Sequence, residues 1–300
     1  MKHKKREVKP FIMGCITTVV VGGLIFSCIK VLSGKKNALH DKSETIDGIT
    51  YTISYERDNG IKCDAYKDIR LKRGSYFITN DGTLYITSDK KYSTTNQNCK
   101  VYDDNIKIRS VIDGVLVAID KTKYIVENNE NNEITFKKDN NVLLNSYLLE
   151  EDIKYAIKDD GEYYEEDGSR LYTYYVLKND GKLYRMVFVV KYNPSTSKYT
   201  YTLEKNELAL EFEGEKITDF YISNNPNSGY IITDKTIYLQ EVKNKECLEY
   251  EDIKCNYEFI KNNYLTKYVN NILSFDYSER SYLYINTLDG KHIEITMTRE

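Results

Sequence analysis

The sequence predicts an all-β fold with one membrane helix in front of it. Two observations favour strands: the 300 residues include 29 tyrosines, and short apolar runs joined by Asp-Gly or Asp-Lys turns recur along the chain. Tyr, Ile, Val and Thr favour the half-buried surface of a sheet over a helix. With 41% hydrophobic residues, the chain can bury a core as one large domain or as two ordinary ones.

The first predicted element is a membrane anchor. Residues 11–29 are apolar and uncharged, and a helix of this length spans the ~30 Å hydrocarbon core of a bilayer. We therefore expect a transmembrane helix over residues 10–32. Residues 1–9 hold five basic groups, so the positive-inside rule makes them a cytoplasmic tail and places the rest outside the membrane. We expect the cell to be bacterial, of the Gram-positive type.

An alternative interpretation of this region begins at Cys28. The letters LIFSC, after a basic and then an apolar segment, resemble a bacterial lipoprotein signal, whose cysteine is lipidated after cleavage. Phe26 departs from that signal, which has a small residue at this position. Both interpretations leave residues 34–300 outside the membrane, with the polar, aperiodic residues 33–48 as a tether.

The folded domain is predicted over residues 49–300, and its clearest hairpin is YFITNDGTLYIT, residues 76–87. A two-residue type I′ turn at Asp81 and Gly82 would join the strands, because both residues tolerate positive φ. One face would then carry Tyr76, Ile78, Tyr85 and Thr87, and the other Phe77, Thr79, Leu84 and Ile86. Neither face is charged, which indicates a sheet covered on both sides.

Related hairpins recur at a spacing typical of four-stranded repeats. The turn aspartates are Asp81, Asp120, Asp180, Asp234 and Asp289, separated by 39, 60, 54 and 55 residues. Several hairpins follow a further β-rich segment; these segments are KDIRLKRG, IKIRSVI, DIKYAIK, KITDFYIS and NILSFDY. Blades of four strands cover one another face to face, as a hairpin with two apolar faces requires.

A lead-in strand followed by ITNDGTLYIT or VLKNDGKLYRM resembles the central strands of blades in extracytoplasmic β-propeller proteins. The resemblance implies five or six four-stranded blades over residues 49–300, with residues 49–56 adding a strand to the last blade. It includes no WD or kelch signature, so it implies architecture and no particular activity. Two tandem β-sandwiches, divided near residues 140–150, are the alternative, and residues 251–271 stay open as a candidate short helix.

Four cysteines lie in the predicted domain: Cys63, Cys99, Cys247 and Cys255. An extracytoplasmic compartment tolerates disulfides, and sequence proximity pairs Cys63 with Cys99 and Cys247 with Cys255. Free, partly buried cysteines are the alternative. Because the sequence has no C-x-x-C spacing and His292 is the one histidine of the predicted domain, we predict no metal site.

The sequence contains few signs of catalysis. His292 follows the last turn and lies by pattern in a strand, and no Walker A, dinucleotide-binding or G-x-S-x-G motif occurs, so no catalytic residue and no cofactor are predicted. The acidic residues 158–168 do not have calcium-loop spacing and are interpreted as a solvated loop. The alternating tyrosines of residues 171–176 and 199–205 are interpreted as packing, with sugar or peptide recognition as the alternative.

The charge distribution excludes one class of partner. Subtracting the +5 of the basic N-terminal residues from the net −3 leaves about −8 for residues 34–300, the wrong sign for a nucleic-acid binder. The leading hypothesis is a non-catalytic, membrane-anchored extracytoplasmic module that binds protein or glycan partners at the cell surface. The alternative is a carbohydrate-active hydrolase, which would need two carboxylates about 5–10 Å apart in the propeller channel.

Overall fold

The computed structural model divides the chain into two compact units, residues 1–42 and 43–300. The described residues are 42–58, 62–88, 97–128, 134–142, 144–150, 152–159, 163–164, 169–222, 229–243, 257–278 and 282–299. The predicted transmembrane helix over residues 10–32, together with Cys28, Cys247 and Cys255, lies outside them. Within the described ranges, no helix is both long enough and apolar enough to cross a membrane.

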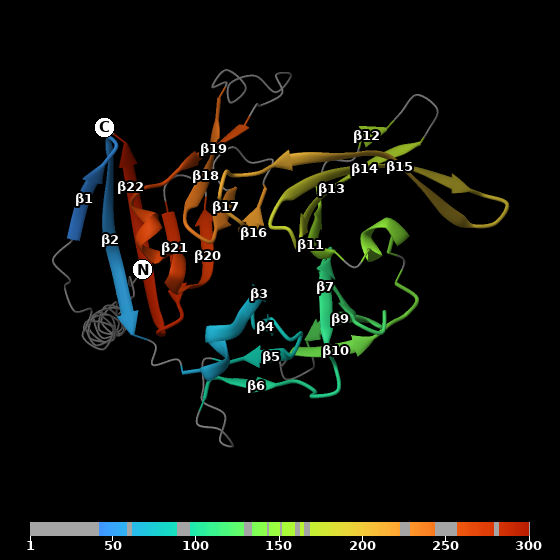
Figure 1. Ribbon diagram of the computed structural model, residues 1–300, viewed down its shortest axis with the longest axis horizontal. Helices are drawn as coiled ribbons and strands as arrows, with labels where there is room; N and C mark the ends of the chain where they lie inside the picture. Colours follow the sequence, from blue (N-terminus) through green and yellow to red (C-terminus); the bar gives the residue numbers. More distant parts are fainter. Residues whose placement is uncertain are drawn as a thin grey trace, which may run out of the picture. The chain divides into compact units, whose positions relative to one another are not determined.

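The described part of the second unit consists mostly of strands, which confirms the all-β prediction (Figure 1). Its described strands form four sheets, and each sheet contains one or two runs of four antiparallel strands, here called meanders. The first meander is β3 (Ile69–Arg73), β4 (Tyr76–Thr79), β5 (Leu84–Thr87) and β6 (Cys99–Val101). The second is β7 (Ile108–Ile112), β8 (Val115–Ala118), β9 (Lys123–Asn128) and β10 (Ile134–Lys138).

The third meander joins the second in one sheet, because β11 pairs in parallel with β7. It consists of β11 (Ile153–Lys158), β13 (Arg170–Lys178), β14 (Leu183–Asn193) and β15 (Lys198–Leu210), with the short β12 (Tyr163–Tyr164) beside β13. The fourth is β16 (Ile217–Tyr221), β17 (Tyr230–Thr233), β18 (Ile237–Val242) and β19 (Tyr257–Lys261). In the described ranges, three short 3-10 helices lie between strands: η1 (Asp64–Asp68), η2 (Ser146–Leu149) and η4 (Leu265–Asn271).

The fifth meander combines the two ends of the second unit. It contains β20 (Ile272–Ser278), β21 (Tyr282–Thr287), β22 (Lys291–Arg299) and β2 (Ile49–Asp58), with β1 (Lys42–Ile46) on its outer edge. The antiparallel pairing of β2 with β22 confirms that residues 49–56 add a strand to the last sheet. Strand β1 lies inside the segment expected to be a tether, so the sheet begins before residue 49.

The hairpin at Asp81 differs from the predicted one by one residue in register. Thr79 donates its backbone N–H to the carbonyl of Thr83 at 3.1 Å, so the loop has three residues and not two. The predicted faces were therefore wrong: Tyr76, Ile78, Leu84 and Ile86 share one face, and Phe77 and Tyr85 share the other. The Asp81 carboxylate explains the longer loop, because it accepts hydrogen bonds from the backbone N–H and the hydroxyl of Thr83.

Both faces of these hairpins are nonetheless covered, as predicted. All four residues of β4, of β8 and of β17 are buried. One hydrophobic cluster extends through the first four meanders and includes Ile78, Leu116, Leu177 and Ile231. A second joins the fourth meander to the fifth, and a smaller one packs Phe77 of the first meander against Leu273 of the fifth.

The stretch of residues 251–271, left open by the sequence, is described from residue 257 onwards. It consists of strand β19 followed by the 3-10 helix η4. Leu265 of η4 is fully buried in the cluster that joins the fourth and fifth meanders. This element therefore closes the core between two sheets.

Gly82 is a position at which a side chain would be costly. Its φ is +85°, and a Cβ there would lie 2.8 Å from the backbone oxygen of Ile108 in the next meander. We expect Gly82→Ala to lower the free energy of unfolding by about 2 kcal/mol more than Gly114→Ala. Gly114 has a similar φ of +78° with nothing within 4 Å of a Cβ, so the pair separates contact from backbone strain in urea unfolding. Equal losses of stability in the two variants would contradict a steric contact between a Cβ at residue 82 and the backbone of Ile108.

Candidate functional site

The first strand of each meander carries a β-bulge at the same place. Each of these strands begins with an isoleucine, and the pairing register shifts immediately after it. The bulged residues are Arg70, Arg109, Lys154, Thr218 and Leu273. A bulge leaves its extra residue outside the ladder and redirects its side chain, so the repeat places five side chains in equivalent positions.

Three of the five bulged residues are basic, and each donates a hydrogen bond to a backbone carbonyl further along the chain. Arg70 Nη2 lies 2.8 Å from the oxygen of Ile108, at the start of the second meander. Arg109 Nη2 lies 2.9 Å from the oxygen of Leu149, which precedes the third meander. Lys154 Nζ lies 3.2 Å from the oxygen of Thr218 in the fourth meander. These side chains therefore link consecutive meanders.

Each guanidinium has further donors beyond this bond. The Nε atoms of Arg70 and Arg109 are buried, and neither finds a hydrogen-bond partner among the described residues. A buried donor without a partner costs about 1–3 kcal/mol. Backbone linkage alone does not account for these two donors.

Arg73 and Asp219 form a second charged pair beside the bulges. Arg73 Nη2 lies 2.6 Å from Asp219 Oδ1, and Nη1 lies 3.1 Å from Oδ2, which makes the contact bidentate. The guanidinium also lies 4.0 Å from the centre of the Tyr155 ring. Burial alone would lower the pKa of Arg73, but the charge of Asp219, the nearby Tyr155 and the hydrogen bonds to Asp219 raise it above its usual value.

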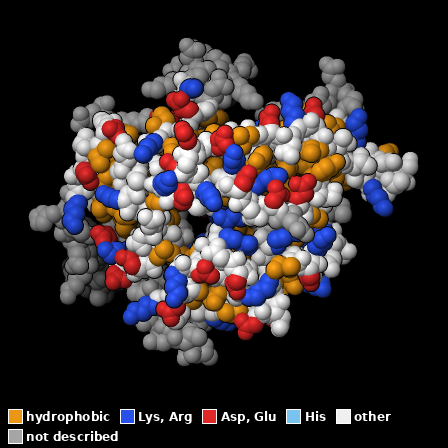
Figure 2. All heavy atoms as spheres, in the orientation of Figure 1, with side chains coloured by type: hydrophobic (Ala, Val, Ile, Leu, Met, Phe, Trp, Pro, Cys, Tyr) orange, Lys and Arg blue, Asp and Glu red, His pale blue; other side chains and the backbone are white. Residues whose placement is uncertain are grey.

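Lys154 lies within electrostatic reach of this pair. The pKa of Lys154 is lowered to about 8: burial is the largest cause, Asp219 acts in the opposite direction, and the positive charges of Arg70 and Arg73 also lower it. We call Arg70, Arg73, Lys154 and Asp219 the basic cluster. It holds three positive groups against one negative group. Basic side chains gather at the centre of the face shown in Figure 2, where the first strands of the meanders lie in Figure 1.

A cavity of about 210 Å³ lies beside the basic cluster. Its polar lining includes Arg70 and Lys72 of β3, Thr218 and Asp219 of β16, and Ser274 of β20. Asp219 is the one carboxylate among the described residues that line it, and Arg73 already binds both of its oxygens. A pair of converging carboxylates is therefore not found at this cavity.

Two further cavities also have acidic residues in their linings. One of about 700 Å³ lies between the first and fifth meanders, and Asp276 is the single carboxylate among the described residues lining it. Another of about 470 Å³, next to β2 and β18, is lined by Asp47 and Glu241. Asp47 accepts a hydrogen bond from Asn263 at 2.7 Å. The described residues that line the cavity next to β2 and β18 include none from the first strand of any meander.

His292 occupies a strand position, as its pattern predicts. It lies in β22 with Nδ1 2.8 Å from Asn286 Oδ1 and Nε2 3.4 Å from Glu294 Oε1. Among the described residues, no three His, Cys, Asp or Glu side chains come together as a metal site would require. Among the described residues, the ring nitrogens of His292 bond to Asn286 and Glu294, which orient the ring.

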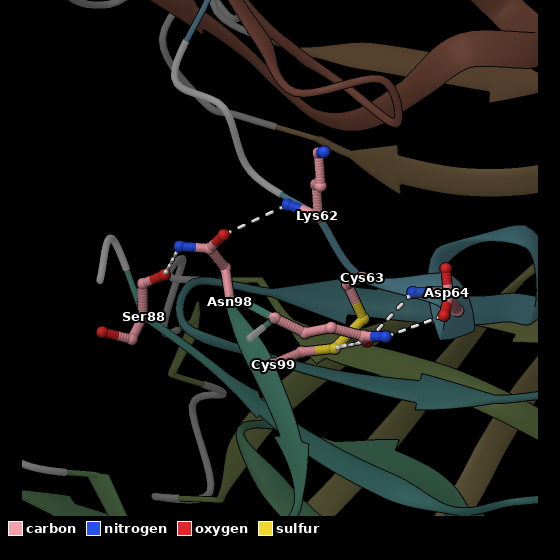
Figure 3. The surroundings of a disulfide bond; sticks show 7 residues. Lys62, Cys63, Asp64, Ser88, Asn98 and Cys99 are labelled. Carbon is pink, nitrogen blue, oxygen red and sulfur yellow. Dashed lines mark hydrogen bonds between the residues drawn. A yellow bond between two sulfur atoms is a disulfide. The ribbon is translucent and has the colours of Figure 1, made fainter. Parts of the chain in front are cut away.

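Cys63 and Cys99 form a disulfide, the pairing that sequence proximity favours (Figure 3). The bond joins the residue before η1 to the first residue of β6, and both cysteines are buried. Hydrogen bonds flank it on each side: Asp64 pairs with Gln97, and Asn98 Oδ1 accepts from the backbone N–H of Lys62 at 3.1 Å. The disulfide therefore ties the chain that enters the first meander to its last strand.

The tyrosine-rich strands divide into buried and exposed parts. Tyr174 packs edge-on against the buried Phe188, with ring centres 5.8 Å apart, as the packing interpretation predicts. Tyr192 and Tyr199 at the end of the β14–β15 hairpin are exposed and lie 5.0 Å from each other. Of the acidic residues 158–168, only 158–159 and 163–164 belong to the described part of the chain.

The basic cluster was not predicted from the sequence, although the lead-in segments carry a signal for it. When the five lead-in segments are aligned on their isoleucine, the following residue is Arg, Arg, Lys, Thr and Leu. In the first three segments, the basic residue after the isoleucine is the bulged residue. As for known proteins, no family model matches the chain, and no similar sequence is found among the curated proteins.

Proposed function

We propose that residues 43–300 form a five-bladed β-propeller that the N-terminal segment anchors outside the cell membrane. The five meanders supply the blades, and β2 completes the last blade from the other end of the domain. Hydrophobic clusters link consecutive meanders and also connect the fifth to the first. Strand β3 lies beside both β16 and β20, which supports a ring with the first strands innermost.

The location outside the membrane has two independent supports. The uncharged residues 11–29 have the length of a membrane span, and the basic residues precede them. The disulfide between Cys63 and Cys99 is typical of proteins in oxidising compartments. Together they support a domain displayed at the cell surface.

The proposed role is non-catalytic binding of cell-surface protein or glycan partners. The observation that carries it is the basic cluster at the first strands: Arg70 and Asp219 line the cavity, Arg73 engages Asp219, and Lys154 bonds to the carbonyl of Thr218 in the same lining. Glycoside hydrolysis uses two carboxylates, one as acid and one as base or nucleophile. The described lining of this cavity supplies one, so its chemistry suits recognition better than bond cleavage.

The test measures binding and turnover in one sample. The full chain in lipid nanodiscs is mixed with purified bacterial cell-envelope glycan, and bound glycan and newly released reducing ends are both measured. We expect saturable binding without release, and empty nanodiscs serve as the control. Release of reducing ends that Glu241→Gln abolishes would instead establish the hydrolase, with Asp47 and Glu241 as its carboxylates.

A further inference from the structure

We propose that the basic cluster binds an oxyanion, a phosphate or carboxylate group carried by the partner. This inference rests on the proposed binding function and adds the chemical class of the ligand. Arg70, which lines the cavity beside β3, β16 and β20, would meet the anionic group there. Arg73 and Lys154 bond to Asp219 and to the Thr218 carbonyl of the same lining and would add positive charge.

The local charge is opposite to that of the domain. Residues 34–300 carry about −8, yet Arg70 and Arg73 both lie close enough to Lys154 to lower its pKa. Gathering like charges at a partly buried place is unfavourable unless an anion offsets them. Asp219 offsets one of the three, and it is held by Arg73 in a bidentate contact. Asp81 also acts on Arg70, but its carboxylate is bonded to Thr79, Thr83 and Lys107. Among the described residues, neither Arg70 nor Lys154 has a carboxylate as a hydrogen-bond partner.

The bulges themselves do not require positive charge. In the fourth and fifth meanders the equivalent positions hold Thr218 and Leu273, and the same register shift forms there. Forming the bulge therefore does not by itself call for a charged residue. The basic residues at positions 70, 109 and 154 stand in consecutive meanders, and the charge of Arg70 acts on Lys154.

The donors fit an oxyanion in number and kind. Arg70 uses Nη2 for the carbonyl of Ile108, while its Nε is buried without a partner among the described residues. Lys154 has three N–H donors, and the bond to the Thr218 carbonyl uses one of them. Guanidinium and ammonium groups together form short, charge-assisted hydrogen bonds to phosphate and carboxylate oxygens.

Lys154 couples binding to pH. Its charged neighbours are Arg70 and Arg73 on β3 and Asp219 on β16. Because burial holds its pKa at about 8 in the folded chain, against 10.5 for an ordinary lysine, protonated Lys154 costs stability below about pH 8. That cost is relieved as the pH rises from about 8 towards 10.5. An anion favours the protonated form, so anion binding is expected to weaken as the pH rises through about 8.

The experiment titrates the full chain in nanodiscs with inorganic phosphate, glucuronate or sulfate at pH 7, using calorimetry and thermal unfolding. We expect saturable binding, and a loss of at least tenfold in affinity in both Arg70→Gln and Lys154→Met. Lys205→Met, an exposed change on β15, is the matched control and should bind as the unmodified chain does. Stronger binding of phosphate or of glucuronate tells which group the partner carries.

Stability measurements distinguish a binding role of Lys154 from a structural one. Lys154→Met without anion should melt at the same or a higher temperature, because a disfavoured charge is removed. A lower melting temperature with unchanged anion affinity would assign Lys154 a structural role and overturn the proposal, as would absent binding or an equal loss in Lys205→Met. Sulfate keeps its charge between pH 7 and 9, so its affinity should fall over this range in the unmodified chain and stay constant in Lys154→Met.

Comparing sulfate binding with envelope-glycan binding tests the oxyanion site and the proposed function separately. If sulfate binds the cluster but envelope glycan does not bind the chain, the site stands and the display module is overturned. If glycan binds equally to the unmodified chain and to Lys154→Met, the module stands and the oxyanion site is overturned. If the unmodified chain binds both sulfate and glycan and Lys154→Met binds neither, the oxyanion site and the display module are both supported.

Discussion

Replacing Cys63 and Cys99 by serine is expected to lower the free energy of unfolding by about 4 kcal/mol. The two cysteines are 36 residues apart in sequence, and opening a loop of this length restores conformational entropy of about that size to the unfolded chain. For a unit of this size, the melting temperature should fall by about 10 °C. Thermal unfolding of the full chain in nanodiscs, followed by circular dichroism, measures the change.

The single variants and a reductant serve as controls. Cys63→Ser and Cys99→Ser should each destabilise as much as the double change, since either removes the same bond. Reductant should lower the melting temperature of the unmodified chain to that of the double variant. Any further drop when the double variant itself is reduced reports on the remaining cysteines. If reductant does not change the melting temperature of the unmodified chain, the disulfide contributes no stability.

The local elements of the fold could be predicted because their signals lie within a few residues of one another. Asp-Gly and Asp-Lys turns between apolar runs mark five hairpins, and all five are present at Asp81, Asp120, Asp180, Asp234 and Asp289. The pairing of β2 with β22 was also predictable, since an unpaired N-terminal strand needs a partner at the sheet edge. Pattern and turn chemistry sufficed for these elements.

The register of the Asp81 hairpin and the residues of the basic cluster depend on contacts that the sequence pattern does not encode. The Asp81 loop gained a residue because its carboxylate accepts from Thr83 and also from Lys107, 26 residues away. Arg73 and Asp219 are 146 residues apart, so their pairing appears only when the first and fourth meanders meet. A bulge is likewise a property of two paired strands. The repeated isoleucine followed by a basic residue was visible, but its meaning required the partner strand.

Asp219→Asn is expected to have opposite effects on stability and on anion binding. The change leaves the charge of Arg73 without its bidentate partner in a place where both side chains are about three-quarters buried, at 22% and 25% exposure. Removing one partner of such a pair costs about 3 kcal/mol. Urea unfolding of the full chain should show this loss.

A double-mutant cycle identifies the cause of that loss. Arg73→Met with Asp219→Leu removes both charges, and should be closer in stability to the unmodified chain than either single change, because no buried charge is left alone. Additive losses would mean that the two side chains do not interact. Asp219→Asn should also bind sulfate several-fold more tightly at pH 7, since the one negative group of the basic cluster is gone. General loosening of the fold would weaken sulfate binding, so lower stability together with tighter binding can come only from the charge balance of the cluster.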